Sequence, residues 1–178
     1  LANTTARLSL MAREGENVSD INEKIYASAN RARSAYDDTA DMVAKLGVLA
    51  GNAFGSTDEV IMFAEQLNKN FKISGTETTG IQAAMLQLTQ AMASGVLRGE
   101  EFNSIMEQAP TVIQTIADYM DVSTGQLKEM AGEGLVTAEV VKAALIGAAE
   151  ETDAKFNSMT VTFSDVWNVF KNKAGQAM

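Results

Sequence analysis

Apolar residues between Ser19 and Leu49 recur at steps of three and four positions, and the segment contains no proline. This spacing places them on one stripe of an α-helix, so it predicts a long N-terminal helix within an arm that covers residues 1–50. The middle of the stripe is formed by small residues, which allow a close approach but bury little area. Two interpretations stay open: the arm packs on the following module, or it is an extended or oligomerising arm. The stripe consists of Ile21, Ile25, Ala32, Ala35, Met42, Leu46 and Leu49.

After a glycine-rich segment at 47–55, which we expect to be a hinge, the pattern changes to a series of short helices. Three segments fit the capping box, in which two amide donors at a helix start are satisfied reciprocally: Ser56–Glu59, Thr79–Gln82 and Ser123–Gln126. Thr137 can cap a further helix. Residues 51–178 are therefore predicted to form a compact irregular bundle, and the whole chain to be all-α with seven to nine helices.

Glycine and proline mark the ends of several of these helices. Gly75 is placed to end the first helix of the bundle, and Gly95 to end the second in the left-handed conformation. A short helix is predicted over 99–109, with Phe102, Ile105 and Met106 buried. Pro110 lacks an amide donor, so we expect it to open a new helix.

The last predicted helix places four large apolar residues on one face: Phe163, Val166, Trp167 and Phe170. An aromatic cluster of this kind is either a buried clamp or an exposed anchor for a partner. We expect Trp167 to be buried.

The composition excludes several classes of function. The formal charge is −9, of which −8 lies beyond residue 50. An acidic surface repels the phosphate backbone, so no direct nucleic-acid partner is expected. The absence of histidine and cysteine removes serine and cysteine triads, HExxH zinc sites and imidazole ligation of haem. No cofactor or metal site is expected, and no apolar run is long enough to cross a bilayer.

Paired carboxylates are the remaining catalytic possibility. Glu100 with Glu101, or Glu150 and Glu151 with Asp153, could in principle cleave a glycosidic bond as in a muramidase-like module. Neither cluster lies among apolar residues that would keep one acid protonated. We interpret both as solvated faces, since negative charge in a first helical turn stabilises the helix. The chain is therefore not expected to be an enzyme.

The segment Leu86–Asn103 reads Leu-Gln-Leu-Thr-Gln-Ala-Met-Ala-Ser-Gly-Val-Leu-Arg-Gly-Glu-Glu-Phe-Asn. It resembles a stretch shared by the tape measure proteins of long-tailed bacteriophages and prophages. The later segment Val161–Trp167 is similar to the closing segment of the same family, and the resemblance covers about Gly55 to Phe170. It is much weaker over the first 50 residues. The chain begins with Leu1 rather than methionine, so we expect a piece of a longer protein.

This resemblance implies a structural role in the phage tail. Tape measure proteins are long and largely helical, lie inside the tail tube, and set by their length how many rings of tube protein assemble. The expected partners are the tube protein, tail chaperones, tip components and further copies of the chain itself. The expected location is the tail interior of the virion, and the host cytoplasm during assembly. A helical adaptor unrelated to phage is the alternative.

The turn around Leu97, Arg98 and Gly99 is our candidate site, either as a corner of the fold or as a docking surface. Arg98 is the only basic residue between Lys72 and Lys128, which makes it the natural partner of Glu100, Glu101 or a carboxylate across an interface. The candidate residues are Leu97, Arg98, Gly99, Glu100, Glu101, Phe102, Asn103 and Trp167.

Overall fold

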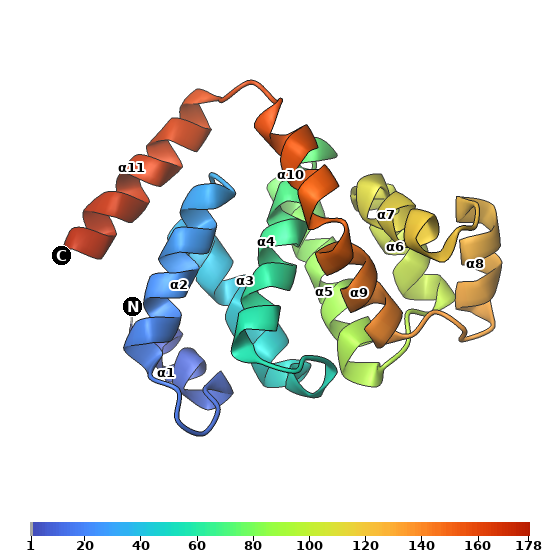
Figure 1. Cartoon of the computed structure of the whole chain (residues 1–178), viewed down its shortest axis with the longest axis horizontal. Helices are drawn as coiled ribbons and strands as arrows, with labels where there is room; N and C mark the ends of the chain where they lie inside the picture. The colour runs from blue at the N-terminus through green and yellow to red at the C-terminus, as the bar shows by residue number, and fades with distance from the viewer. Residues whose placement is uncertain (1) are drawn as a thin grey trace. The chain divides into compact units, whose positions relative to one another are not determined.

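The computed structural model describes residues 2–178, which form eleven α-helices, one short 3-10 helix and no strand (Figure 1). The all-α prediction is confirmed, but the helices are more numerous and shorter than predicted. Two groups of helices form separate compact units. Unit 1 comprises residues 1–68 and 160–178, and unit 2 comprises residues 69–159. The predicted division into an arm over residues 1–50 and a module over residues 51–178 stays a prediction.

Unit 1 contains the N-terminal helices and the last helix of the chain. Here α1 packs against α2 and α3, α2 packs against α3, and α11 lies on α2. The close approach of α1 and α3 depends on Gly47, because a Cβ there would lie 2.5 Å from the Met11 Cε. The elements are α1 (Ala2–Met11), α2 (Val18–Arg31), α3 (Tyr36–Leu49), η1 (Gly51–Ala53), the first part of α4 (Thr57–Ile73), and α11 (Phe163–Ala177).

Unit 2 is built around α7, which contacts α6, α8 and α9. In addition, α5 packs against α6 and α9, and α10 against α9. Its elements after the end of α4 are α5 (Thr78–Ser94), α6 (Gly99–Gln108), α7 (Pro110–Met120), α8 (Thr124–Gly132), α9 (Ala138–Gly147) and α10 (Ala149–Asn157).

The predicted long N-terminal helix is wrong, because α2 and α3 are separated by a turn at Ala32–Ala35. Arg33 adopts the left-handed conformation with φ of 53°. The Ser34 amide donates to the Ala29 carbonyl (2.9 Å) and the Arg33 amide to the Asn30 carbonyl (3.1 Å). These two bonds form a Schellman motif, which usually has glycine in the left-handed position. Most of the predicted apolar stripe is buried, and α2 packs back against α3, but Ala35 is half-buried and Leu49 is 63% exposed.

A side chain from the far end of the chain stabilises this turn. Asn172 of α11 is 3% exposed. Its Oδ1 accepts from the Tyr36 amide at the start of α3 (2.8 Å), and its Nδ2 donates to the Ser34 carbonyl (2.7 Å). The residue that precedes α3, Ala35, provides no side-chain cap. Asn172 therefore supplies from a distant helix the cap that the local sequence lacks.

Most of the predicted helix ends in the second half of the chain are confirmed. Ser123 and Gln126 form a reciprocal capping box, and Thr137 accepts from the Val140 amide. Gly95 ends α5 in the left-handed conformation, and Pro110 opens α7. The box at Thr79–Gln82 is wrong, because α5 begins at Thr78 after Glu77.

The Ser56–Glu59 box forms in a modified way. The Ser56 hydroxyl accepts from the Glu59 amide (3.1 Å), while the Glu59 carboxylate accepts from the Gly55 amide (2.6 Å). The expected hinge segment before it is held by Arg13, whose guanidinium donates to the carbonyls of Gly51, Phe54 and Gly55. A polar contact thus fixes the loop that leads into α4.

Replacing Asn172 by alanine should lower the free energy of unfolding by about 1–3 kcal/mol, because the buried Tyr36 amide loses its partner. Urea unfolding followed by circular dichroism measures the change. Lys173→Ala is the matched control: Lys173 is the next residue along α11, is exposed, and should change stability by no more than about 0.5 kcal/mol. Equal stabilities of the two variants would show that the cap is dispensable.

A second prediction concerns Tyr36, which stacks on Tyr26 with ring centroids 3.9 Å apart. Burial, together with the charges of Tyr26 and Asp37, raises the pKa of Tyr36 to about 12. The unfolded phenol ionises near pH 10. The native state therefore holds this proton more tightly, so its contribution to stability is complete below about pH 10 and is lost as the pH rises through about 12. Tyrosinate absorbance should show one late step that is absent in Tyr36→Phe, and its absence from the parent chain would contradict the assignment.

Candidate interaction site

The backbone of the 95–99 turn in unit 2 is fixed by the loop that precedes α9. The Leu97 amide donates to the Val136 carbonyl, and the Ala138 amide to the Gly95 carbonyl, both over 2.8 Å. Val96 and Thr137 form an isolated antiparallel bridge. Gly95 has φ of 91°, a conformation that residues with a Cβ rarely adopt. The bridge joins residues 41 positions apart in the sequence, so two distant segments meet at one corner.

The apolar side chains of the candidate site belong to the core of unit 2. Leu97 is fully buried and Phe102 is 2% exposed. Ile105 is also buried, whereas Met106, which we expected to be buried, is 38% exposed. Leu97 and Phe102 therefore hold the corner together and are not available to a partner.

Arg98 faces solvent and forms no ion pair within residues 2–178, so the expected ion pair with Glu100 or Glu101 is not made. The Glu101 carboxylate instead accepts a hydrogen bond from the Arg98 backbone amide (2.9 Å). The guanidinium lies beside Gly134, where an added Cβ would be 3.7 Å from Nη1. Arg98 is thus an exposed cation held at a rigid corner.

The remaining candidates of this segment divide between the two roles. Gly99 is half-buried, and a Cβ on it would meet the Gly132 backbone at 3.9 Å. Glu100 and Asn103 are exposed on α6. The side chains that can meet a partner are therefore those of Arg98, Glu100 and Asn103.

Trp167 lies in unit 1, and the expectation that it is buried is wrong. Its side chain is 49% exposed and stacks on Phe170 with centroids 5.6 Å apart. The predicted gathering of aromatic residues on one face of the last helix is correct, but that face points to solvent.

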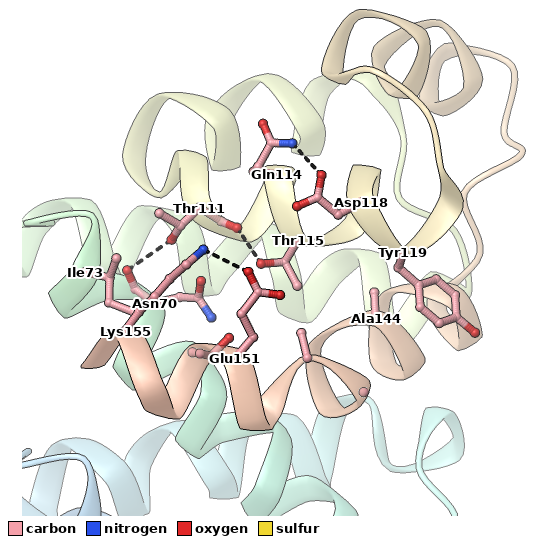
Figure 2. Close-up of a pocket in the computed structure, with 13 residues that line it drawn as sticks. Asn70, Ile73, Thr111, Gln114, Thr115, Asp118, Tyr119, Ala144, Glu151 and Lys155 are labelled. Carbon is pink, nitrogen blue, oxygen red and sulfur yellow. Dashed lines mark hydrogen bonds and ion pairs between the residues drawn. The ribbon is translucent and has the colours of Figure 1, made fainter. Parts of the chain in front are cut away.

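Sequence reasoning missed a cavity of about 300 Å³ in unit 2. Figure 2 shows residues from α4, α7, α9 and α10 around it, with the Glu151 side chain directed toward Lys155. Its lining includes the small residues Ala144, Gly147 and Ala148. The polar lining includes Asn70, Thr111, Gln114, Thr115, Asp118, Glu151 and Lys155. No periodicity could reveal it, because the lining comes from helices far apart in the sequence.

The two carboxylates of this cavity already have partners. Glu151 pairs with Lys155 (3.2 Å), and both side chains are well exposed. Asp118 is exposed and accepts from the Gln114 amide group (2.7 Å). A glycosidase acid has to be shielded from water to keep its proton at neutral pH. This arrangement does not provide such shielding.

Asp153, which belongs to the same predicted carboxylate cluster as Glu151, is also engaged. Asp153 accepts from the ammonium of Lys69 (2.6 Å), which is 4% exposed and lies 5.7 Å from the centroid of the Phe156 ring. Within residues 2–178, no group of three or more acidic side chains could hold a metal ion. In the same part of the chain, no helix has both the length and the apolar character needed to cross a bilayer.

The part of the chain that the structure describes is an all-helical fold with an exposed corner at residues 98–103. Residues 1–178 match the model of a protein family described as tape measure protein. The chain therefore belongs to the tape measure protein family, whose members are components of phage tails. No curated protein and no solved structure matches the chain.

The two roles within the candidate site can be separated by stability measurements. Leu97→Ala should lower the free energy of unfolding by about 2–5 kcal/mol, because it leaves a cavity in the core. Arg98→Glu should change it by no more than about 0.5 kcal/mol, since the side chain is exposed and unpaired. Thermal unfolding of the two variants shows which side chain belongs to the core and which is free to contact a partner. If Arg98→Glu lowered the free energy of unfolding as much as Leu97→Ala, the Arg98 side chain would be needed for the stability of the corner.

Proposed function

We propose that the chain is a structural module of a phage or prophage tail tape measure protein that contributes to tail assembly and to the determination of tail length. The observation that carries this proposal is the family match over the whole chain. The proposed location is the interior of the virion tail, and the host cytoplasm during assembly.

Within this role, the segment serves as a folded contact module. An α-helix advances about 1.5 Å per residue, so a helical ruler needs long uninterrupted helices. The longest helices described are α4 and α5, with 17 residues each. The segment itself is therefore poorly suited to measure a distance. We assign it the contacts that position the tape measure protein among the tube protein, tail chaperones or tip components.

The contact surface proposed in unit 2 is the exposed part of the 98–103 corner. Unit 2 carries six basic and twelve acidic residues, and Lys69, Lys142 and Lys155 pair with carboxylates. Arg98 is presented at a position whose backbone is fixed from both sides. Because the backbone at Arg98 is already held by hydrogen bonds, binding a carboxylate of a partner would cost little further backbone entropy.

A non-enzymatic role is part of the proposal. It is supported by the engaged and solvated carboxylates of the cavity and by the absence of histidine and cysteine from the sequence. The muramidase-like alternative has no observation in its favour beyond the presence of two acids in the cavity lining.

The test is complementation of a phage that encodes this chain in its tape measure protein. Arg98→Glu should leave the melting temperature unchanged and reduce the yield of tailed particles at least tenfold, as counted by electron microscopy. Lys128→Glu is the matched control: it makes the same charge change on an exposed residue of α8 and should assemble normally. If a folded Arg98→Glu variant gave normal tails, the corner around Arg98 would not be a contact surface for assembly.

A further inference from the structure

The outer face of α11 is apolar and exposed. At about 100° per residue, Phe163, Val166, Trp167 and Phe170 fall within a stripe about 100° wide. Their side chains are 85%, 58%, 49% and 61% exposed, respectively. Exposed large apolar residues gathered in one patch are typical of an interaction surface.

The inner face of the same helix is polar. Asp165 and Asn172 are buried, and Asn168 donates to the Arg33 carbonyl (3.3 Å). Asp165 also lies 4.0 Å from the Arg33 guanidinium and closes a capping box with Thr162. An ordinary surface helix has the opposite arrangement, with its apolar face inward. The aromatic stripe therefore does not hold α11 in place, and the fold of unit 1 does not explain it.

The charges around the stripe define what it can bind. Lys171 and Lys173 project on opposite sides of the stripe, about 80° from its centre. Both are exposed, and neither forms an ion pair within residues 2–178. The one acidic residue of α11, Asp165, is on the buried side. On α11 itself, the exposed charges that flank the stripe are therefore all positive.

We propose that the outer face of α11 is a docking site for an α-helix of a partner protein whose apolar stripe is flanked by aspartate or glutamate. The apolar stripes pack together, and the flanking charges set the choice and the orientation of the partner, as charged positions do beside the seam of a coiled coil. The inference does not depend on the proposed role in tail assembly.

Two other occupants fit less well. In a second copy, an identical stripe would bring lysines toward lysines, which is unfavourable. An anionic membrane would be attracted by only two lysines, at about 1 kcal/mol each. Unit 1, which carries α11, has eleven acidic and eight basic residues and would be repelled by such a surface.

Trp167 is the only tryptophan in the chain, so its fluorescence reports on this face directly. The probes are two designed helical peptides with the same leucine stripe, one flanked by glutamates and the other by lysines. The glutamate peptide should shift the Trp167 emission to the blue and bind at least tenfold more tightly at low salt. The difference should shrink as salt is added, because the charges are exposed.

Charge reversal provides the sharpest control. K171E/K173E should invert the preference between the two peptides, and Phe170→Ala should weaken binding of the glutamate peptide about tenfold. Both changes lie on the exposed face, so circular dichroism should show an unchanged fold.

Three results would overturn the proposal. The first is equal or absent binding of the two peptides. The second is a dimer in sedimentation analysis that Phe170→Ala abolishes, which would assign the face to a second copy. The third is binding to vesicles of phosphatidylcholine and phosphatidylserine without a preference between the peptides. None of these results depends on tail assembly, so the failure of one proposal is distinguishable from the failure of the other.

Discussion

The structure depends on satisfying the backbone groups at the ends of many short helices. Each α-helix leaves four amides and four carbonyls without a partner inside the helix. Schellman motifs with left-handed residues follow α4 at Gly75 and α8 at Gly134, where glycine makes this conformation easy, and also α2 at Arg33 and α7 at Asp121. Ser56, Ser123, Thr137 and Thr162 provide hydroxyl caps at helix starts. Where no neighbouring residue caps a helix start, a residue distant in the sequence does so, as Asn172 caps α3.

This dependence explains which parts of the fold could be predicted from sequence. Gly95, Pro110 and Ser123 act on their own helices, so their neighbours in the sequence are enough to identify the helix ends. The turn at Arg33 has neither glycine nor proline, and part of its stabilisation comes from Asn172 in another helix. Because no residue near Arg33 signals a helix end, the continuous apolar stripe over residues 19–49 predicted a single helix. The predicted cap at Thr79 is wrong for a simpler reason, because the N-cap of α5 is Glu77, two residues earlier.

The candidate site was predictable to a similar degree. The motif located the 95–103 segment, and glycine chemistry correctly set its conformation, but the bonds to Val136 and Ala138 are long-range and have no local signal. The exposure of the α11 stripe could have been inferred, since Asp165, Asn168 and Asn172 recur at helical spacing opposite the aromatic residues. The prediction that Trp167 is buried relied on the size of the aromatic residues and did not take this polar stripe into account. The inward face of a helix is set by the hydrogen bonds its neighbours need as well as by hydrophobicity.

The course of α4 links the energetics of the two units. The division between them falls within this helix, between Asn68 and Lys69. Phe63 and Leu67 are fully buried on one side of that point, and Phe71 is 1% exposed on the other. Melting either half would fray the hydrogen-bond ladder of its neighbour, because each bond joins residues four apart. Unfolding of α4 in one unit would therefore weaken α4 in the other. Neither unit can be excised without cutting through this helix.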